Sequence, residues 1–340
     1  HLSIRRQRQM CIRDRGDPRS FDLLDRLLDD QVYRLSSWRV AAEEINYRRF
    51  FDINELAAIR MENLEVFRQT HRLILRLMEE GKVTGLRLDH PDGLFDPPQY
   101  FHVLQRERFA QLARAHLRED SPAAEPDWEL AVAQAVAEFE ACCPPYPMGS
   151  GCRPLYLLAE KILARGERLP IEWAIHGTTG YEFLALVNGL FVDGQNEKAM
   201  TTAYTTFAGQ RTPYADIVYE SKQLIMRASM SSELNVLGHA LDRLSERNRY
   251  SRDFTLNSLT HALREVIACF PVYRTYIDGR SPEVALQDRA CVEVAIAFAK
   301  RRNPATDISV FDFVRDVLLL RYPENVDEAY REAQLAFVRK

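Results

Sequence analysis

The stretch "KVTGLRLDHPDGLF", residues 82 to 95, decides the fold. A short apolar run ends abruptly in charged and turn-forming residues, among them Arg87, Asp89 and His90. Because side chains alternate along a strand, Arg87 and Asp89 share one face, where the guanidinium can pair with the carboxylate. The pattern predicts a buried strand that ends in reactive groups.

A second apolar run of strand length, "PLYLLAEKIL" at residues 154 to 163, ends in Glu160 and Lys161. Helical periodicity predicts helices over 54–80, 97–117 and 127–142, and weaker strands are predicted over 171–175 and 271–277. Helices that alternate with short apolar strands indicate a parallel sheet covered on both faces. In such folds, and above all in (β/α)8 barrels, reactive side chains follow the carboxyl ends of the strands. The alternative is that each carboxylate only caps a helix or faces solvent.

Two carboxyl groups at strand ends suit the cleavage of a glycosidic bond. In a retaining mechanism, one carboxylate attacks the anomeric carbon and the other carboxyl acts as acid and then as base. A divalent metal is the alternative, but His90 and Asp92 as further ligands would crowd one loop. The six cysteines form no C-x-x-C pair. We therefore predict neither a metal nor a cofactor.

The composition is that of an ordinary globular protein and suggests no charged partner. The 340 residues carry a net charge of −4, with both signs interspersed, so no nucleic-acid partner is expected. No apolar run approaches the ~20 residues that a membrane helix needs, and a cytoplasmic location is the default expectation. Residues 1–15 are arginine-rich and lack a regular period, so we predict an extraneous basic segment; a disordered basic arm is the alternative.

The motifs around these strand ends resemble the α-amylase family. "GLRLDHPDGL" is similar to the strand-four motif of that family. Further stretches resemble the maltooligosyl trehalose synthase family within it: "YRLSSWRVAAEEINYRRFFDINELAAIRME", "YLLAEKIL", "LPIEWAIHGTTGYEFLALVNGLFVD", "SRDFTLNSLTHALREVIACFPVYRTYI" and "FDFVRDVLLL". The resemblance covers about residues 21–340.

This resemblance implies Asp89 as nucleophile, Glu160 as general acid/base and Arg87 as the arginine that orients the nucleophile. The implied reaction is an intramolecular transglycosylation, in which a glucosylmutase of trehalose biosynthesis converts the reducing-end α-1,4 bond of a maltooligosaccharide into an α,α-1,1 bond. Many amylases carry lysine and histidine three and four residues after the nucleophile, where this chain has Asp92 and Gly93. The acceptor side is therefore expected to differ from that of the amylases.

Aromatic rings beside hydrogen-bonding cations suit sugar faces and hydroxyls, and the stretch "NYRRFF" combines both. The alternative is that its phenylalanines are core and its arginines form surface ion pairs. Weaker candidates follow the strands or lie in "GTTGY", and for Tyr181 core packing is an equal alternative. The predicted substrate-binding residues are His90, Asp92, Tyr47, Arg48, Arg49, Phe50, Lys161, Trp173, Thr178, Thr179 and Tyr181.

The expected architecture is α/β, an incomplete (β/α)8 TIM barrel with a large α-helical insertion. Residues 16–194 form the partial barrel, with an insertion at about 118–153, and residues 195–340 form the helical subdomain, with helices expected over 253–268, 283–301 and 325–339. The resemblance places the third catalytic carboxylate beyond Lys340, so the chain is expected to be an inactive central fragment.

The expected partners are a maltooligosaccharide and a trehalose-releasing hydrolase that works alongside. Two other functions stay open: another α-amylase-family hydrolase or transferase, and a non-catalytic helical protein that binds glucans or other proteins.

Overall fold

The computed structural model of the chain describes residues 21–120, 128–143, 153–281, 283–324 and 326–340. The predicted basic segment 1–15 lies outside these residues. Most of the described chain is helical. The helices are α2 (Asp22–Asp29), α3 (Ala41–Glu44), α4 (Leu64–Glu79), α5 (Pro97–Asp120), α6 (Trp128–Cys142), α7 (Tyr181–Gly189), α8 (Glu197–Ala208), α9 (Tyr214–Ala228), α10 (Ser231–Glu246), α11 (Leu256–Ala268), α12 (Leu286–Arg302), α13 (Ile308–Leu318) and α14 (Glu328–Arg339).

Five strands form two small sheets in the described residues. Strands β1 (Arg49–Phe50) and β2 (Ile53–Ala57) make an antiparallel hairpin. Strands β3 (Gly85–Leu88), β4 (Tyr156–Ala159) and β5 (Gly177–Thr178) make a parallel sheet in the order β3-β4-β5. The fold is mixed α/β, as predicted from the sequence; closure into a barrel stays a prediction.

Glycine at position 85 lets β3 approach β4 closely. A Cβ atom there would lie 2.9 Å from the carbonyl oxygen of Tyr156, a distance that real Cβ contacts do not reach. The parallel register then runs from Gly85 opposite Tyr156 to Leu88 opposite Ala159. This register brings the ends of the two strands level with each other.

The parallel sheet packs against α4 and α5 through one apolar cluster. Leu157 and Ala159 of β4 are fully buried, together with Phe67 and Met78 of α4 and Phe101 of α5. Burying an aromatic or aliphatic side chain of this size contributes about 1.5–3 kcal/mol. The cluster therefore fixes the direction in which the strands, and the residues after them, leave the core.

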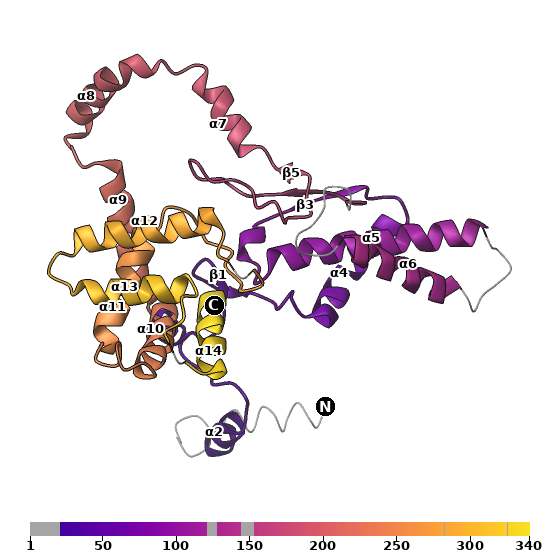
Figure 1. Cartoon of the computed structure of the whole chain (residues 1–340), viewed down its shortest axis with the longest axis horizontal. Coiled ribbons are helices and arrows are strands. Elements are labelled where there is room, and N and C mark those ends of the chain that lie inside the picture. Colours follow the sequence, from indigo (N-terminus) through magenta and orange to yellow (C-terminus); the bar gives the residue numbers. More distant parts are fainter. Residues whose placement is uncertain (1–20, 121–127, 144–152, 282, 325) are drawn as a thin grey trace, which may run out of the picture.

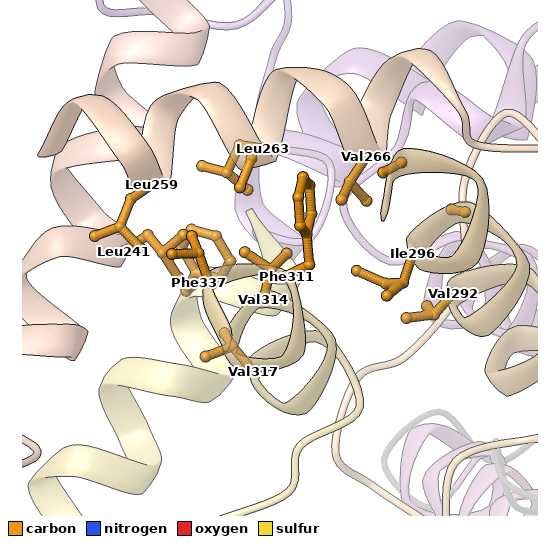
Figure 2. Close-up of a cluster of buried hydrophobic side chains, with 14 of the residues drawn as sticks. Leu241, Leu259, Leu263, Val266, Val292, Ile296, Phe311, Val314, Val317 and Phe337 are labelled. Carbon is orange, nitrogen blue, oxygen red and sulfur yellow. The ribbon is translucent and has the colours of Figure 1, made fainter. Parts of the chain in front are cut away.

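A second apolar cluster holds α10 to α14 together (Figure 2). Phe311 of α13 is fully buried at its centre, between Leu263 and Val266 of α11 and Ile296 of α12.

Helices α5 and α6 project away from the group α10 to α14, and α7 and α8 form an arch above it (Figure 1). In the described part of the chain, no helix is both long and apolar enough to cross a membrane.

Three predicted elements differ from the structure. Residues 53–57 pair with β1, so the helix predicted from residue 54 begins only at Leu64, where the Asn63 side chain accepts a hydrogen bond from the Glu65 N–H. Residues 171–175 make turn hydrogen bonds, Trp173 N–H to Pro170 O and Ile175 N–H to Trp173 O, and β5 starts at Gly177 instead. Residues 271–277 form no strand.

Candidate active site

The candidate catalytic carboxylates lie at the same end of the parallel sheet. Leu88 and Ala159 are opposite each other, so Asp89 and Glu160 are the next residues on neighbouring strands. The Glu160 N–H donates to the Leu88 carbonyl at 2.8 Å, and the His90 N–H donates to Glu160 Oε2 at 3.2 Å. The backbone that follows Asp89 therefore holds the Glu160 side chain.

Arg87 pairs with Asp89 on the exposed face of β3. The guanidinium Nη2 lies 2.7 Å from Asp89 Oδ1, and the two side chains are 58% and 75% exposed. Ion pairs with this much exposure contribute little to stability. The pair can instead orient the Asp89 carboxylate toward solvent, where a substrate would approach.

The turn after Asp89 has a constrained backbone. His90 takes a left-handed conformation with φ of 45°, which is uncommon for a residue other than glycine, and the 3₁₀ helix η3 (Pro91–Gly93) follows it. A Cβ atom at Gly93 would lie 2.5 Å from the His90 ring, so a larger residue there would displace that ring. This turn directs the His90 ring toward three aromatic side chains.

These three rings lie around His90 and come from two distant segments, the hairpin and the segment before α12. The centroid of the His90 ring lies 5.3 Å from that of Phe50, 6.1 Å from that of Phe51 and 5.5 Å from that of Tyr273. Tyr273 Oη is 3.3 Å from His90 Nε2. All three aromatic side chains are exposed, so they offer apolar faces next to the strand end. Tyr273 was not predicted, because its stretch was assigned to a strand.

The other predicted residues of "NYRRFF" lie in β1 or just before it. The Arg49 side chain is 3% exposed, and its Nη2 lies 2.6 Å from Glu233 Oε1 of α10. Tyr47 Oη donates to the Asn54 carbonyl at 2.9 Å. Arg48 is exposed. Arg49 therefore anchors the hairpin to α10, and Arg48 is the arginine of this stretch that faces solvent.

Two predicted substrate ligands, Asp92 and Lys161, form a buried ion-pair network. Lys161 Nζ lies 3.1 Å from Asp92 Oδ2 and 2.8 Å from Glu167 Oε1, and the lysine side chain is fully buried. Tyr276 donates its hydroxyl to the other oxygen of Asp92. This network lies within the protein and connects the residues that follow β3 with those that follow β4.

Tyr276 and Arg274 join the segment before α12 to this network, and sequence reasoning missed both. Arg274 Nη1 donates to the carbonyls of Asp92 and Leu94 at 3.0 and 2.7 Å. Burial raises the pKa of the Tyr276 phenol, and the Asp92 charge and hydrogen bond raise it further. Burial also lowers the pKa of Arg274, which stays a cation. The alternation of aromatic and cationic residues in "PVYRTYI" is the sequence signal that could have identified them as site residues.

The remaining predicted residues follow β4 and β5. Trp173 is 1% exposed and packs in the cluster beneath the sheet, 4.9 Å from Phe101 between ring centroids. The Thr178 hydroxyl donates to Glu182, the Thr179 N–H donates to the Ala159 carbonyl at 3.0 Å, and Tyr181 is 39% exposed. Thr178 and Thr179 therefore lie beside the end of β4, whereas Trp173 supports the sheet from below.

Metal-ligating side chains do not gather in groups of three or more anywhere in the described ranges. The strand-end groups are instead two carboxylates, an arginine, a histidine and exposed rings. Such a set can attack and protonate a bond to a sugar whose face stacks on the rings.

Comparison with known proteins finds similar chains in sequence and in structure. A putative maltooligosyl trehalose synthase of Mycobacterium tuberculosis (strain ATCC 25618 / H37Rv) is 33% identical over 173 residues, which are 51% of this chain. The solved maltooligosyltrehalose synthase of Arthrobacter ramosus superposes on 95% of the chain with a TM-score of 0.63 and 29% identity. This chain is similar to maltooligosyl trehalose synthases.

The similarity covers only part of each synthase. The matched segment is 17% of the length of the mycobacterial protein, and the chain covers 32% of the Arthrobacter synthase. A solved glycosyltrehalose synthase superposes on 86% of the chain with a TM-score of 0.53 and 26% identity. No protein-family model matches.

Proposed function

We propose that this chain supplies the catalytic pair of a (1→4)-α-D-glucan 1-α-D-glucosylmutase, an enzyme of trehalose biosynthesis. The observation that carries the proposal is the register of β3 and β4, because Asp89 and Glu160 directly follow the opposed residues Leu88 and Ala159. Relatives named maltooligosyl trehalose synthase support the same reaction class. We assign catalysis to residues 16–194 and a supporting role to the helical residues 195–340.

In the proposed reaction, the Asp89 carboxylate attacks the anomeric carbon of the penultimate glucose of a maltooligosaccharide. Glu160 gives its proton to the leaving O4 of the reducing-end glucose, so that a glycosyl-enzyme forms. The released glucose stays bound and turns, and Glu160 then removes the proton from its anomeric hydroxyl. That oxygen displaces Asp89, which leaves an α,α-1,1 bond and consumes no water.

The aromatic side chains around His90 support retention of the released glucose. Phe50, Phe51 and Tyr273 are exposed beside the strand end, and a pyranose ring can stack on such faces while it turns. Arg48, Thr178, Thr179 and Tyr181 are proposed hydrogen-bonding neighbours of the sugar. A hydrolase that releases trehalose from the product is the proposed partner enzyme.

The test uses a chimera, because the chain spans about a third of the solved synthase. Residues 21–340 replace the matching region of the Arthrobacter enzyme, and products from maltopentaose are separated by chromatography. We expect trehalose-ended products. Asp89→Asn and Glu160→Gln should each lower turnover by at least about 10³-fold, since each removes a group that bonds to the reacting atoms. Asp253→Asn, an exposed carboxylate outside the site, is the matched control.

Other outcomes of this experiment separate the alternatives. Glucose or maltose as the main product would indicate another α-amylase-family hydrolase or transferase. Binding of maltopentaose without turnover would indicate a non-catalytic glucan-binding protein. Near-normal turnover by the Asp89→Asn chimera would remove Asp89 from the mechanism.

A further inference from the structure

A polar groove lies between helices α10 and α11, apart from the strand-end residues. Its volume is about 340 Å³, and it is lined by Asn235, His239, Leu256, Asn257, Thr260, His261 and Arg264. The lining residues recur at three- and four-residue spacing, so they form one face of each helix. Gly238 brings the helices together, because a Cβ atom there would lie 2.4 Å from Thr260 Oγ1. The groove therefore lies on two closely packed helices, whose positions are labelled in Figure 1.

The groove carries donors and positive charge without an acidic counterpart. One arginine and two histidines line it, and none of its lining residues is an aspartate or a glutamate. Arg264 Nε is buried and has no hydrogen-bond partner. Within the described residues, no ion pair or hydrogen bond involves the side chains of Arg264, His239 or His261. A buried donor without a partner is costly, and an acceptor supplied by a ligand would remove that cost.

The chemistry of the lining favours an oxyanion over other ligands. Metal ions prefer carboxylates, thiolates or several imidazoles, and an adjacent arginine repels them. A sugar site characteristically offers an aromatic ring to stack on, and the lining residues include no tyrosine, tryptophan or phenylalanine. Leu256 and Asn257 belong to the first turn of α11, where the helix dipole adds partial positive charge.

We propose that this groove binds the phosphate group of a small phosphorylated metabolite, with Arg264 as its anchor and His239 and His261 as further donors. A guanidinium matches phosphate geometry through paired N–H donors. The groove is much larger than a bare phosphate, so it has room for a small organic group. The proposal does not depend on the proposed glucosylmutase activity.

The test titrates the 340-residue chain with inorganic phosphate and, separately, with glycerol 3-phosphate, while chloride keeps the ionic strength constant. The imidazole proton resonances of His239 and His261 are followed by NMR and assigned with His239→Gln and His261→Gln variants. We expect saturable shifts of both resonances, with Kd in the range of about 0.1–10 mM and tighter binding of glycerol 3-phosphate. Chemical shifts that change linearly with ligand concentration and do not saturate would contradict a specific binding site in the groove. Tighter binding of inorganic phosphate than of glycerol 3-phosphate would contradict the proposal that the ligand is a phosphorylated metabolite.

Variants of Arg264 test the anchor. Arg264→Gln should weaken binding by about tenfold or more, because a charge-assisted hydrogen bond is lost, and Arg264→Lys should recover part of it. Arg243→Gln, an exposed arginine of α10 outside the groove, should change nothing. Circular dichroism checks that each variant folds, and His261→Gln replaces Arg264→Gln if the latter does not. Unchanged affinity in the folded variant would overturn the proposal.

Discussion

Lys161 illustrates how one residue can connect two segments of a candidate site. Its ammonium group is fully buried between the Asp92 and Glu167 carboxylates, and Glu160 precedes it in the chain. A buried cation between two anions resists any change that removes one member, because the others lose their counter-charge. The position of the candidate acid/base is therefore tied to the turn that follows Asp89.

Replacement of this cation should be strongly destabilising. Lys161→Met removes the charge and retains much of the side-chain volume, so two buried carboxylates lose their partner. We expect the free energy of unfolding to fall by about 3–5 kcal/mol in urea denaturation. Arg60→Met, which breaks the exposed pair between Arg60 and Glu62, should cost less than about 1 kcal/mol. Similar losses in the two variants would contradict the role of burial.

Sequence could predict local pairs of residues but not this network. Arg87 and Asp89 are two positions apart, and the alternation of a strand was enough to predict that they face the same side. Asp92 and Lys161 are 69 positions apart, and Tyr276 is 184 positions from Asp92. Their contact depends on the strand order and on the path of the chain between α11 and α12. For that reason Asp92 and Lys161 were predicted as substrate-binding residues, and their ion pair with each other was not predicted.

At the scale of elements, apolar periodicity predicted long helices well and short strands poorly. The predictions over 97–117 and 127–142 correspond to α5 and α6, and those over 253–268, 283–301 and 325–339 correspond to α11, α12 and α14. Most of strand β2 was predicted as the start of a helix, because only its pairing with β1 distinguishes it from a helical segment. Residues 271–277 are apolar and alternate like a strand, yet Arg274 and Tyr276 bond to the turn after β3 instead.

The first turn of α12 contains Asp288, a carboxyl group whose ionisation lowers the stability of the folded state. Asp288 lines a cavity of about 650 Å³ between residues 168–173 on one side and residues 276–281 and 283–288 on the other. Burial raises the pKa of Asp288 to about 6, although a hydrogen bond from the Tyr276 N–H opposes the rise. The folded state therefore keeps a proton that the unfolded chain loses above pH 3.8. The stability from this group is complete below that pH and is lost as the pH rises through 6.

Asp288→Asn should consequently stabilise the protein at neutral pH. The amide keeps an acceptor for the Tyr276 N–H and carries no charge. We expect the free energy of unfolding at pH 7.5 to rise by about 1–2 kcal/mol, after allowance for solvent screening, and the rise at pH 4 to be several-fold smaller. Urea denaturation at both pH values measures this, with Asp253→Asn as the exposed control. A gain of equal size at pH 4 would contradict the ionisation argument.

At the scale of the whole molecule, α7 and α8 form an arch (Figure 1). Large apolar side chains in and beside these two helices are exposed. Phe191, just after α7, is 85% exposed, and Phe207 of α8 is 94% exposed. Exposed apolar side chains of this size promote association. We expect the chain to self-associate at micromolar concentration in light scattering, and Phe191→Ser with Phe207→Ser to reduce it. The pair Arg211→Ser with Glu220→Ser, which changes two exposed charged residues outside α7 and α8, should leave the association in place.

The last prediction at this scale concerns catalysis by the 340-residue chain alone. The parallel sheet of the described residues has three strands with β3 and β5 at its edges, whereas a closed barrel of this type has eight. An oxocarbenium-like transition state also needs preorganised charge around the sugar, and loss of one such group typically costs about 10²- to 10³-fold. We therefore expect no trehalose-ended product from maltopentaose by chromatography, with the Asp89→Asn chain as blank. Conversion above that blank would mean that the described strand ends suffice for the reaction.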